Sequence, residues 1–260
     1  MKPTRLVDLH CHILPGIDDG TPSLEDAIKL ATTAVADGVG YVLATPHHLD
    51  RHYTNHAVTV RKAVQALQAE LIRREIQLQL FPSQEIHVTG QLMEKLDDVL
   101  GMDVAGKYLL LELPHGMVPN YLSQIVFQLL CRGITPVIAH PERNDQILAN
   151  PQILADLVKQ GALAQVTATS LVGGFGRQVQ QMAKELVVCG LVQVVGSDAH
   201  ASKNRAFAMT HAYQVLATIA PELPEQFKNN ARNLLNGEKV LVTTTALAKR
   251  SWFSWPYKGV

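Results

Sequence analysis

Short apolar runs alternate with longer segments of helical period along most of the chain. Runs of strand length recur seven times, each bounded by polar or turn-forming residues. We predict strands at Leu6–Leu9, Tyr41–Ala44, Gln77–Phe81, Tyr108–Leu111, Thr135–Ala139, Ala164–Val166 and Gln193–Val195. Because helix-period segments separate these runs, the pattern indicates βα units and a mostly parallel sheet.

The intervening segments place apolar residues at the spacing of an amphipathic helix. We predict helices over Leu24–Asp37, Thr59–Arg74, Tyr121–Arg132, Ile153–Gln160, Gln178–Cys189, Arg205–Ile219 and Phe227–Leu235. The first has the clearest ends, since Ser23 can cap it and Gly38 can end it. About seven strand–helix repeats favour an irregular α/β barrel over an open sheet, although periodicity alone leaves that choice open.

The length of 260 residues suits a single α/β domain spanning 1–260. We expect the segment 239–260 to form a C-terminal strap outside the motif-bearing region. Its aromatic residues are Trp252, Phe253, Trp255 and Tyr257. The strap is expected to pack on the domain, and a contact between copies of the chain is the alternative.

Composition and charge exclude several classes of protein. The formal net charge is zero, which argues against binding nucleic acid through phosphate neutralisation. No apolar stretch approaches the roughly 20 residues needed to cross a bilayer, and no apolar signal-peptide region precedes Asp8. Three cysteines without a Cys-x-x-Cys pair suit a reducing compartment. We therefore expect a cytoplasmic protein without nucleic acid or membrane insertion.

The cysteines also exclude one type of phosphatase. Cysteine-based phosphatases need an arginine six positions after the nucleophilic cysteine, so that the loop can cradle phosphate. The residues at that spacing here are Ile17, Val137 and Val195. Any phosphatase chemistry must therefore use another nucleophile.

Two histidines follow the first predicted strand. Side chains alternate between the faces of an extended segment, so His10 and His12 point the same way and Cys11 points the opposite way. In parallel α/β folds the active site lies at the carboxyl ends of the strands. This histidine pair is therefore a candidate metal site.

Metal-competent side chains recur at the other strand ends. The candidate ligands are His10, His12, Asp19, His47, Glu85, Glu112, His140, Asp198 and His200. A single such residue is usually an ordinary solvated polar group, but six of the seven predicted strands end in one. The exception is the strand Ala164–Val166, which is followed by Thr167 and offers only a hydroxyl. Imidazole and carboxylate ligands without paired thiolates suit manganese, iron, zinc or magnesium, and nine ligands suit two or three ions.

Two arginines lie in the loops that carry these ligands. Arg143 follows His140 by three positions, and Arg205 follows His200 by five. A guanidinium group offers a planar fork of donors that matches phosphate oxygens. The alternative for each arginine is an intrachain salt bridge.

Six motifs together resemble the PHP (polymerase and histidinol phosphatase) superfamily. They are Asp8–Gly20, Ala44–His48, Gln84–Ile86, Leu111–Pro114, Ala139–Arg143 and Gly196–His200. Within that superfamily they look most like the manganese-dependent bacterial protein-tyrosine phosphatases encoded with capsule and exopolysaccharide genes. The spacing is family-like to about Gly237, and Ser83 stands where a glycine is expected.

The resemblance implies a distorted (β/α)7 barrel with a trinuclear site, Mn²⁺ being the expected ion. It implies three ion sites, formed by His10, His12, Glu85 and Asp198, by Glu85, Glu112 and His140, and by Asp19, His47 and His200. Arg143 and Arg205 would bind the substrate phosphate. In the mechanism that we expect, His200 or His47 would donate a proton to the leaving group only if it is not fully committed to a metal ion.

The expected reaction is hydrolysis of phosphotyrosine on protein. The resemblance also implies a partner, the C-terminal tyrosine cluster of a bacterial tyrosine kinase that controls polysaccharide synthesis. One alternative is a small-molecule phosphatase of the same superfamily, such as histidinol-phosphate phosphatase. The other is a non-catalytic regulator that binds the kinase. The filled set of ligand positions disfavours a regulator, and zero net charge disfavours a nuclease.

Overall fold

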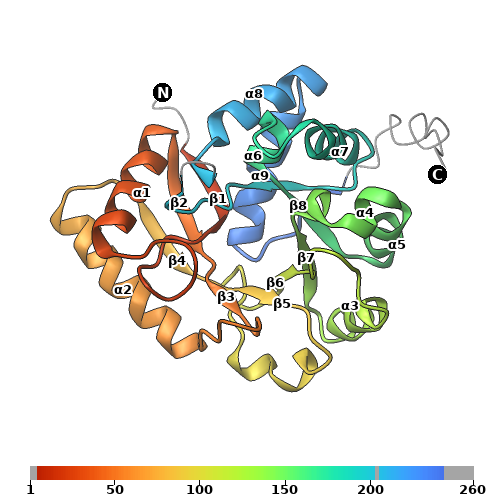
Figure 1. Ribbon diagram of the computed structural model, residues 1–260, viewed down its shortest axis with the longest axis horizontal. Helices are drawn as coiled ribbons and strands as arrows, with labels where there is room; N and C mark the ends of the chain where they lie inside the picture. Colours follow the sequence, from red (N-terminus) through yellow and green to blue (C-terminus); the bar gives the residue numbers. More distant parts are fainter. Residues whose placement is uncertain (1–4, 203–204, 243–260) are drawn as a thin grey trace.

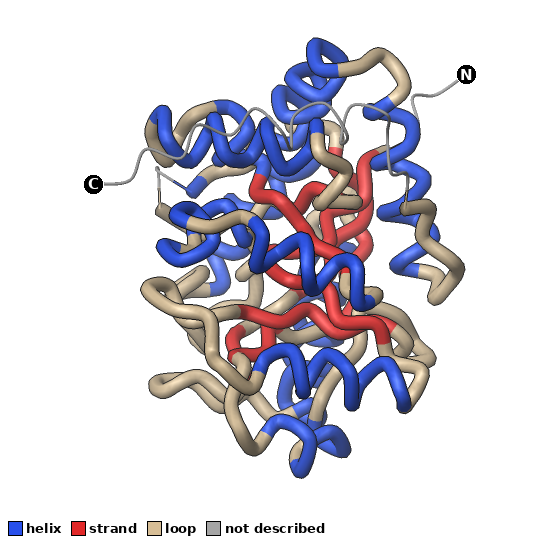
Figure 2. The backbone as a smooth tube through the Cα atoms, turned by 90° about the vertical axis from the view of Figure 1, so that its right-hand side faces the viewer, coloured by secondary structure: helices blue, strands red, loops and turns tan. Residues whose placement is uncertain are grey.

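The computed structural model describes residues 5–202 and 205–242, which form two parallel sheets (Figure 1). The smaller sheet has the order β1 (Leu6–Cys11), β2 (Val39–Ala44), β4 (Gln79–Pro82). The larger has the order β3 (His47–His48), β5 (Glu85–His87), β6 (Tyr108–Glu112), β7 (Thr135–Ala139), β8 (Leu163–Thr167), β9 (Val194–Gly196). Every strand pair is parallel, and helices surround the strands, which confirms the α/β class (Figures 1 and 2).

All seven predicted strands are present, and two short strands were missed. β3 and β5 continue β2 and β4 after breaks of two residues, so two of the predicted strands take part in both sheets. Backbone hydrogen bonds hold the chain together at these breaks, from the Ser83 N–H to the Ala44 carbonyl (2.9 Å) and from the Glu85 N–H to the Pro46 carbonyl (3.1 Å). The breaks turn the polar ends of both strands toward one region.

The two sheets also meet at their other edges. The segment after β9 runs beside β1, where the Asp198 N–H donates to the His10 carbonyl (2.8 Å) and the His12 N–H donates to the Ala199 carbonyl (3.1 Å). The carboxyl end of β9 therefore lies against the carboxyl end of β1, although the two are far apart in sequence.

Helices follow most strands and cover the sheets. They are α1 (Leu24–Ala36), α2 (Ala57–Arg73), α3 (Leu122–Cys131), α4 (Asp145–Ala149), α5 (Gln152–Gln160), α6 (Ala168–Val172), α7 (Arg177–Val188), α8 (Met209–Ile219) and α9 (Leu223–Leu235), with 3-10 turns η1 (Leu92–Glu94), η2 (Leu96–Asp98) and η3 (Pro141–Arg143). The Ser23 hydroxyl accepts a hydrogen bond from the Asp26 N–H, as expected for the cap of α1. The five-residue helices α4 and α6 were missed because they are too short to show a period.

Two predicted helix starts were wrong by four residues. The helix expected from Phe227 begins earlier, at Leu223. The helix expected from Arg205 begins at Met209. The carboxylate of Asp37, at the end of α1, accepts hydrogen bonds from the Met209 N–H (2.6 Å) and the Thr210 N–H (3.3 Å). Because this cap comes from another helix, the local sequence does not specify where α8 begins.

Strands β6, β7 and β8 are mostly apolar because they are buried on both faces. On β7, Val137 and Ala139 belong to a core enclosed by the strands, whereas Ile138 packs into the larger core between sheets and helices. Among the described residues, no helix combines the length and apolar character that crossing a bilayer requires.

Only the first part of the predicted strap falls within the described residues. There the Asn230 side chain on α9 accepts from the Leu241 N–H (3.0 Å) and donates to the Leu241 carbonyl (3.1 Å). The aromatic residues from Trp252 onward lie outside the described residues, so their role stays a prediction.

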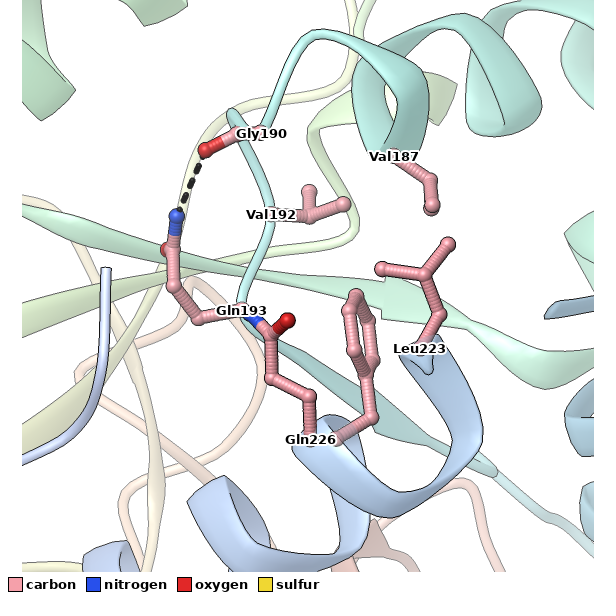
Figure 3. Close-up of a pocket in the computed structure, with 7 residues that line it drawn as sticks. Val187, Gly190, Val192, Gln193, Leu223 and Gln226 are labelled. Atoms are coloured by element: carbon pink, nitrogen blue, oxygen red, sulfur yellow. Dashed lines mark hydrogen bonds between the residues drawn. The ribbon is translucent and has the colours of Figure 1, made fainter. Parts of the chain in front are cut away.

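A small pocket lies beside α9, lined by Val187, Gly190, Val192, Gln193, Leu223, Gln226 and Phe227 (Figure 3). The Gln193 side chain is committed to the backbone, accepting from the Ala164 N–H (2.9 Å) and donating to the Gly190 carbonyl (3.0 Å). Gln193 precedes β9, whereas the polar motifs follow the strands. The candidate chemistry therefore lies at the opposite end of the strands.

Candidate metal centre

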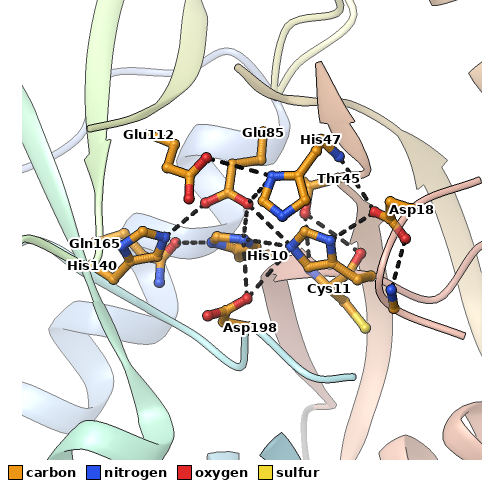
Figure 4. A network of polar contacts seen from close by, with 12 residues as sticks. His10, Cys11, Asp18, Thr45, His47, Glu85, Glu112, His140, Gln165 and Asp198 are labelled. Carbon is orange, nitrogen blue, oxygen red and sulfur yellow. Dashed lines mark hydrogen bonds and ion pairs between the residues drawn. The ribbon is translucent and has the colours of Figure 1, made fainter. Parts of the chain in front are cut away.

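The two histidines at the end of β1 form the centre of a buried polar cluster (Figure 4). The Nε2 atoms of His10 and His12 lie 3.2 Å apart. The Oε2 atom of Glu85 lies 3.2 Å from the first and 3.1 Å from the second. The Oδ1 atom of Asp198 lies 3.4 Å from both. The structure therefore brings together the four residues that the sequence assigns to one ion.

Glu85 uses its second carboxylate oxygen as well. Its Oε1 atom lies 2.8 Å from the Nε2 atom of His140. Glu112 is in the same cluster, but its ion-pair contacts among the described residues are with His47 (3.5 Å) and His87 (3.3 Å). Glu85 thus lies between histidines on two sides, whereas Glu112 faces a different histidine from the one predicted.

A third group lies at the rim of the cluster. The Oδ1 atom of Asp19 lies 3.4 Å from the Nε2 atom of His47 and 3.4 Å from the Nε2 atom of His200. The Asp19 side chain is 44% exposed, compared with 13% for His47 and 3% for His200. The structure therefore brings the three predicted residues together, with one side open to solvent.

Both arginines contact one carboxylate of the cluster. The Nη2 atom of Arg205 donates to the two Asp198 oxygens at 2.7 Å each, and the Nη1 atom of Arg143 donates to Asp198 Oδ2. Asp198 has φ +51° and His140 has φ +33°, in the left-handed region that non-glycine residues rarely adopt. Such strain is typical of functional sites.

Three supporting residues were missed by the sequence analysis. The Nδ1 atom of His12 lies 2.8 Å from Asp18 Oδ2, and the Nδ1 atom of His10 lies 2.8 Å from Gln165 Oε1. These contacts fix both rings with the Nε2 atoms facing the cluster, as is usual for metal-binding histidines. Asp8 accepts hydrogen bonds from the Ser197 N–H (2.8 Å) and hydroxyl (2.6 Å). Gln165 could have been found from the sequence, because it is a glutamine within the buried strand Leu163–Thr167.

The pKa values reflect burial and mutual attraction. Burial opposes charging of His12, but Asp18 and then Glu85 outweigh it and raise its pKa to about 9. Burial likewise opposes charging of His47, yet its carboxylate neighbours, Glu85 foremost, raise its pKa to about 12. In a protein without metal these histidines are protonated at neutral pH. A divalent cation can replace such protons as the positive charge among the carboxylates.

Within the described residues, four groups of side chains offer ligand atoms that lie within 4.8 Å of one another. They are His10, Glu85 and His140; His10, His12 and Asp198; His12, Asp19 and His200; and His12, His47 and Glu85. Every predicted ligand except Glu112 belongs to at least one group. Two buried ring nitrogens, His47 Nδ1 and His200 Nε2, make no hydrogen bond within the described ranges. The arrangement therefore fits the hypothesis of more than one ion.

The fold and this site define the class of protein: an α/β protein that carries a metal-competent histidine and carboxylate cluster at the carboxyl ends of its parallel strands. Residues 6–236 match the family described as capsular polysaccharide synthesis, CpsB/CapC. The chain belongs to this family.

Related proteins extend over nearly the whole chain. The chain is 40% identical to the tyrosine-protein phosphatase YwqE of Bacillus subtilis over 90% of its own length and 93% of that protein. It is 34% identical to the putative tyrosine-protein phosphatase CapC of Staphylococcus aureus, over 95% and 99%. A solved structure from work on YwqE and on CpsB from Streptococcus pneumoniae, described as metal-dependent tyrosine phosphatases, matches with a TM-score of 0.89 and 39% identity, covering 92% of this chain and 98% of that one.

Proposed function

We propose that this protein is a metal-dependent phosphomonoesterase that hydrolyses phosphotyrosine on protein. The observation that carries the proposal is the cluster around Glu85, in which eight of the nine predicted ligands converge beside two arginines. The relatives named tyrosine-protein phosphatases support the choice of substrate.

The donor set fits divalent metal ions. It combines buried imidazoles with buried carboxylates and contains no thiolate ligand, which suits Mn²⁺, Fe, Zn²⁺ or Mg²⁺, and we propose Mn²⁺. Packing several buried carboxylates this closely is costly unless cations lie among them. His47 Nδ1 and His200 Nε2 make no hydrogen bond within the described ranges and lie 3.2 Å from Glu85 and 3.4 Å from Asp19, which places them as ligand atoms beside carboxylates.

We assign the ligands to three sites, of which the first two would share Glu85. They are formed by His10, His12, Glu85 and Asp198, by Glu85, Glu112 and His140, and by Asp19, His47 and His200. The contacts of Glu85 with His10 and His12 through one oxygen and with His140 through the other support its bridging role. Glu112 would join the second site after a change of partner, since it faces His47 and His87 here.

When bound, the ions would offset the charge of the phosphate and lower the pKa of a coordinated water, which is then the nucleophile. Arg143 and Arg205 would bind phosphoryl oxygens with the guanidinium donors that Asp198 does not use. Cys11 takes no part: it is buried, its thiol faces the Ala199 carbonyl, and burial raises its pKa well above the usual value. A cysteinyl phosphate intermediate is therefore not involved.

The leaving group makes modest demands. A tyrosyl oxygen has a pKa of about 10, so it is expelled more easily than an alkoxide. His200 or His47, beside the exposed Asp19, would donate a proton to this oxygen only if it is not fully committed to an ion. The rim position suits the role because a protein-bound tyrosine must enter from solvent.

We propose that the substrate is the C-terminal tyrosine cluster of a bacterial tyrosine kinase that controls capsular or exopolysaccharide synthesis. The family's connection with capsular polysaccharide synthesis supports this assignment. We place the reaction in the cytoplasm, in keeping with cysteines that form no disulfide among the described residues.

We further propose that the two sheets are one distorted (β/α)7 barrel within a single domain. The continuation of β2 into β3 and of β4 into β5, together with the hydrogen bonds between β1 and the segment after β9, supports closure. A barrel of this kind gathers all strand ends at one face, as the cluster requires.

The first test is an activity assay of chelated protein. A phosphotyrosine peptide and histidinol phosphate would each be supplied with Mn²⁺, Mg²⁺, Zn²⁺ or no metal. We expect Mn²⁺ to restore hydrolysis of the peptide, with little activity on histidinol phosphate. The opposite preference would identify a small-molecule phosphatase. No hydrolysis of either substrate, with metal bound, would favour a regulator without catalytic activity.

A further inference from the structure

An aromatic residue on a glycine-rich turn contacts one of the two arginines. Phe175 lies between α6 and α7, in the sequence Gly173-Gly174-Phe175-Gly176. The Cζ atom of Arg143 lies 5.1 Å from the centroid of the Phe175 ring, within the range of a cation–π interaction. The guanidinium carbon therefore lies over the face of the aromatic ring.

The turn is built to hold this ring in place. Gly173 and Gly176 have φ +92° and φ +91°, which favour glycine. A Cβ atom on Gly174 would lie 2.4 Å from Cγ2 of Thr169, so a side chain there would clash. The Gly174 N–H also donates to the Thr169 carbonyl (2.9 Å). Phe175 is thus carried on a tight, anchored turn.

Arg143 is held at two places. Its Nη1 atom donates to Asp198, and its Cζ atom lies over the Phe175 ring. The side chain is only 13% exposed, so little water competes for the guanidinium. A guanidinium has five N–H donors, and an aromatic ring holds the cation without accepting a conventional hydrogen bond from them.

We propose that Phe175 is a positioning residue that holds the Arg143 guanidinium aimed at the substrate phosphate. The proposal rests on the proposed function, in which Arg143 binds phosphoryl oxygens. The aromatic ring is required because its negative face attracts the cation, whereas an aliphatic side chain of similar size offers packing alone.

A double-mutant cycle tests the proposal with the metal-loaded full chain. We expect Phe175→Leu to lower kcat/KM on a phosphotyrosine peptide about fivefold, which corresponds to about 1 kcal/mol. Phe175→Tyr should restore at least half of the wild-type value. In an Arg143→Ala background, Phe175→Leu should change kcat/KM less than twofold. In an Arg205→Ala background, the matched control, the fivefold loss should persist.

Binding of inorganic phosphate gives a second readout that does not depend on turnover. We expect calorimetry to give a phosphate Kd about fivefold weaker for Phe175→Leu, and this difference should vanish when Arg143 is alanine. If the wild type binds phosphate but does not hydrolyse the peptide, the proposed function fails while the same phosphate measurements still decide the role of Phe175. Equal losses in the Arg143→Ala background, or no rescue by Phe175→Tyr, would overturn the proposal.

Discussion

The buried and the exposed halves of the site differ in how their charges are balanced. Around Glu85 and Asp198 the side chains are almost wholly buried, and each carboxylate faces several cationic groups. Asp19 at the rim is 44% exposed and pairs with His47 and His200 across 3.4 Å. Water can compensate for a lost partner at the rim but not in the interior. Loss of a buried ligand should therefore disturb more than one ion, whereas loss of a rim residue should cost one ion and part of the turnover.

The largest effect is expected for Glu85→Gln. Glu85 contacts His10, His12, His47 and His140, so its loss disturbs two proposed ion sites at once. Removing a single transition-state donor typically costs about 10²–10³ in rate, so we expect a loss of at least about 1000-fold in kcat/KM. Elemental analysis should show fewer bound ions.

A matched control is Asp103→Asn. Asp103 is a buried carboxylate near the amino end of β6, where it accepts hydrogen bonds from the Ala105 and Tyr108 N–H groups. The Asp103→Asn variant should keep full metal content and turnover. Normal turnover of Glu85→Gln would contradict the bridging role.

A smaller loss is expected for His200→Ala at the rim. This change removes one of the two imidazoles that face Asp19 and a ring whose centroid lies 4.2 Å from that of the His12 ring, but it keeps every proposed ligand of the first two ion sites. We expect turnover to fall by up to about 100-fold and the metal content to fall by one ion per chain. Near-normal turnover with full metal loading would refute the third ion site.

The same division explains how far the sequence could predict this molecule. Strands buried on both faces have continuous apolar runs, so they were found. The predicted ligands lie at or near the strand ends, and eight of the nine come together in the structure. The short strand His47–His48 was missed because its residues are polar and follow a proline. The roles of Asp18, Gln165 and Phe175 depend on where the rings of His12 and His10 and the guanidinium of Arg143 lie, and spacing along the chain does not determine those positions.

A moderate effect is expected for Asp18→Asn, which leaves every proposed ligand in place. Asp18 holds the His12 ring through a contact of 2.8 Å to Nδ1 and helps keep the His12 pKa raised to about 9. Loss of such a supporting carboxylate typically costs about tenfold or more in metal affinity or activity. We therefore expect the Mn²⁺ concentration that gives half-maximal activity to rise about tenfold.

Asp98→Asn provides the control for this change. Asp98 also contacts a histidine ring, that of His56, but outside the metal centre. Its loss should leave the metal requirement unaltered. Equal Mn²⁺ titrations for wild type and Asp18→Asn would show that Asp18 does not support the metal centre.

The smallest effect is expected for Tyr213→Phe, which removes a buried polar atom that has no proposed role in metal binding. The Tyr213 hydroxyl on α8 is buried and makes no hydrogen bond within residues 5–202 and 205–242, and burial raises its pKa. Bound ions would account for the nitrogens of His47 and His200 that make no hydrogen bond. Tyr213 is not part of any of the four groups of possible ligands. Leaving a buried polar group unpaired costs about 1–3 kcal/mol, so Tyr213→Phe should raise the free energy of unfolding by about 1 kcal/mol. Urea unfolding should show a higher midpoint with an unchanged slope, while kcat and KM stay at wild-type values. A lower midpoint would mean that the hydroxyl has a partner, such as a bound water.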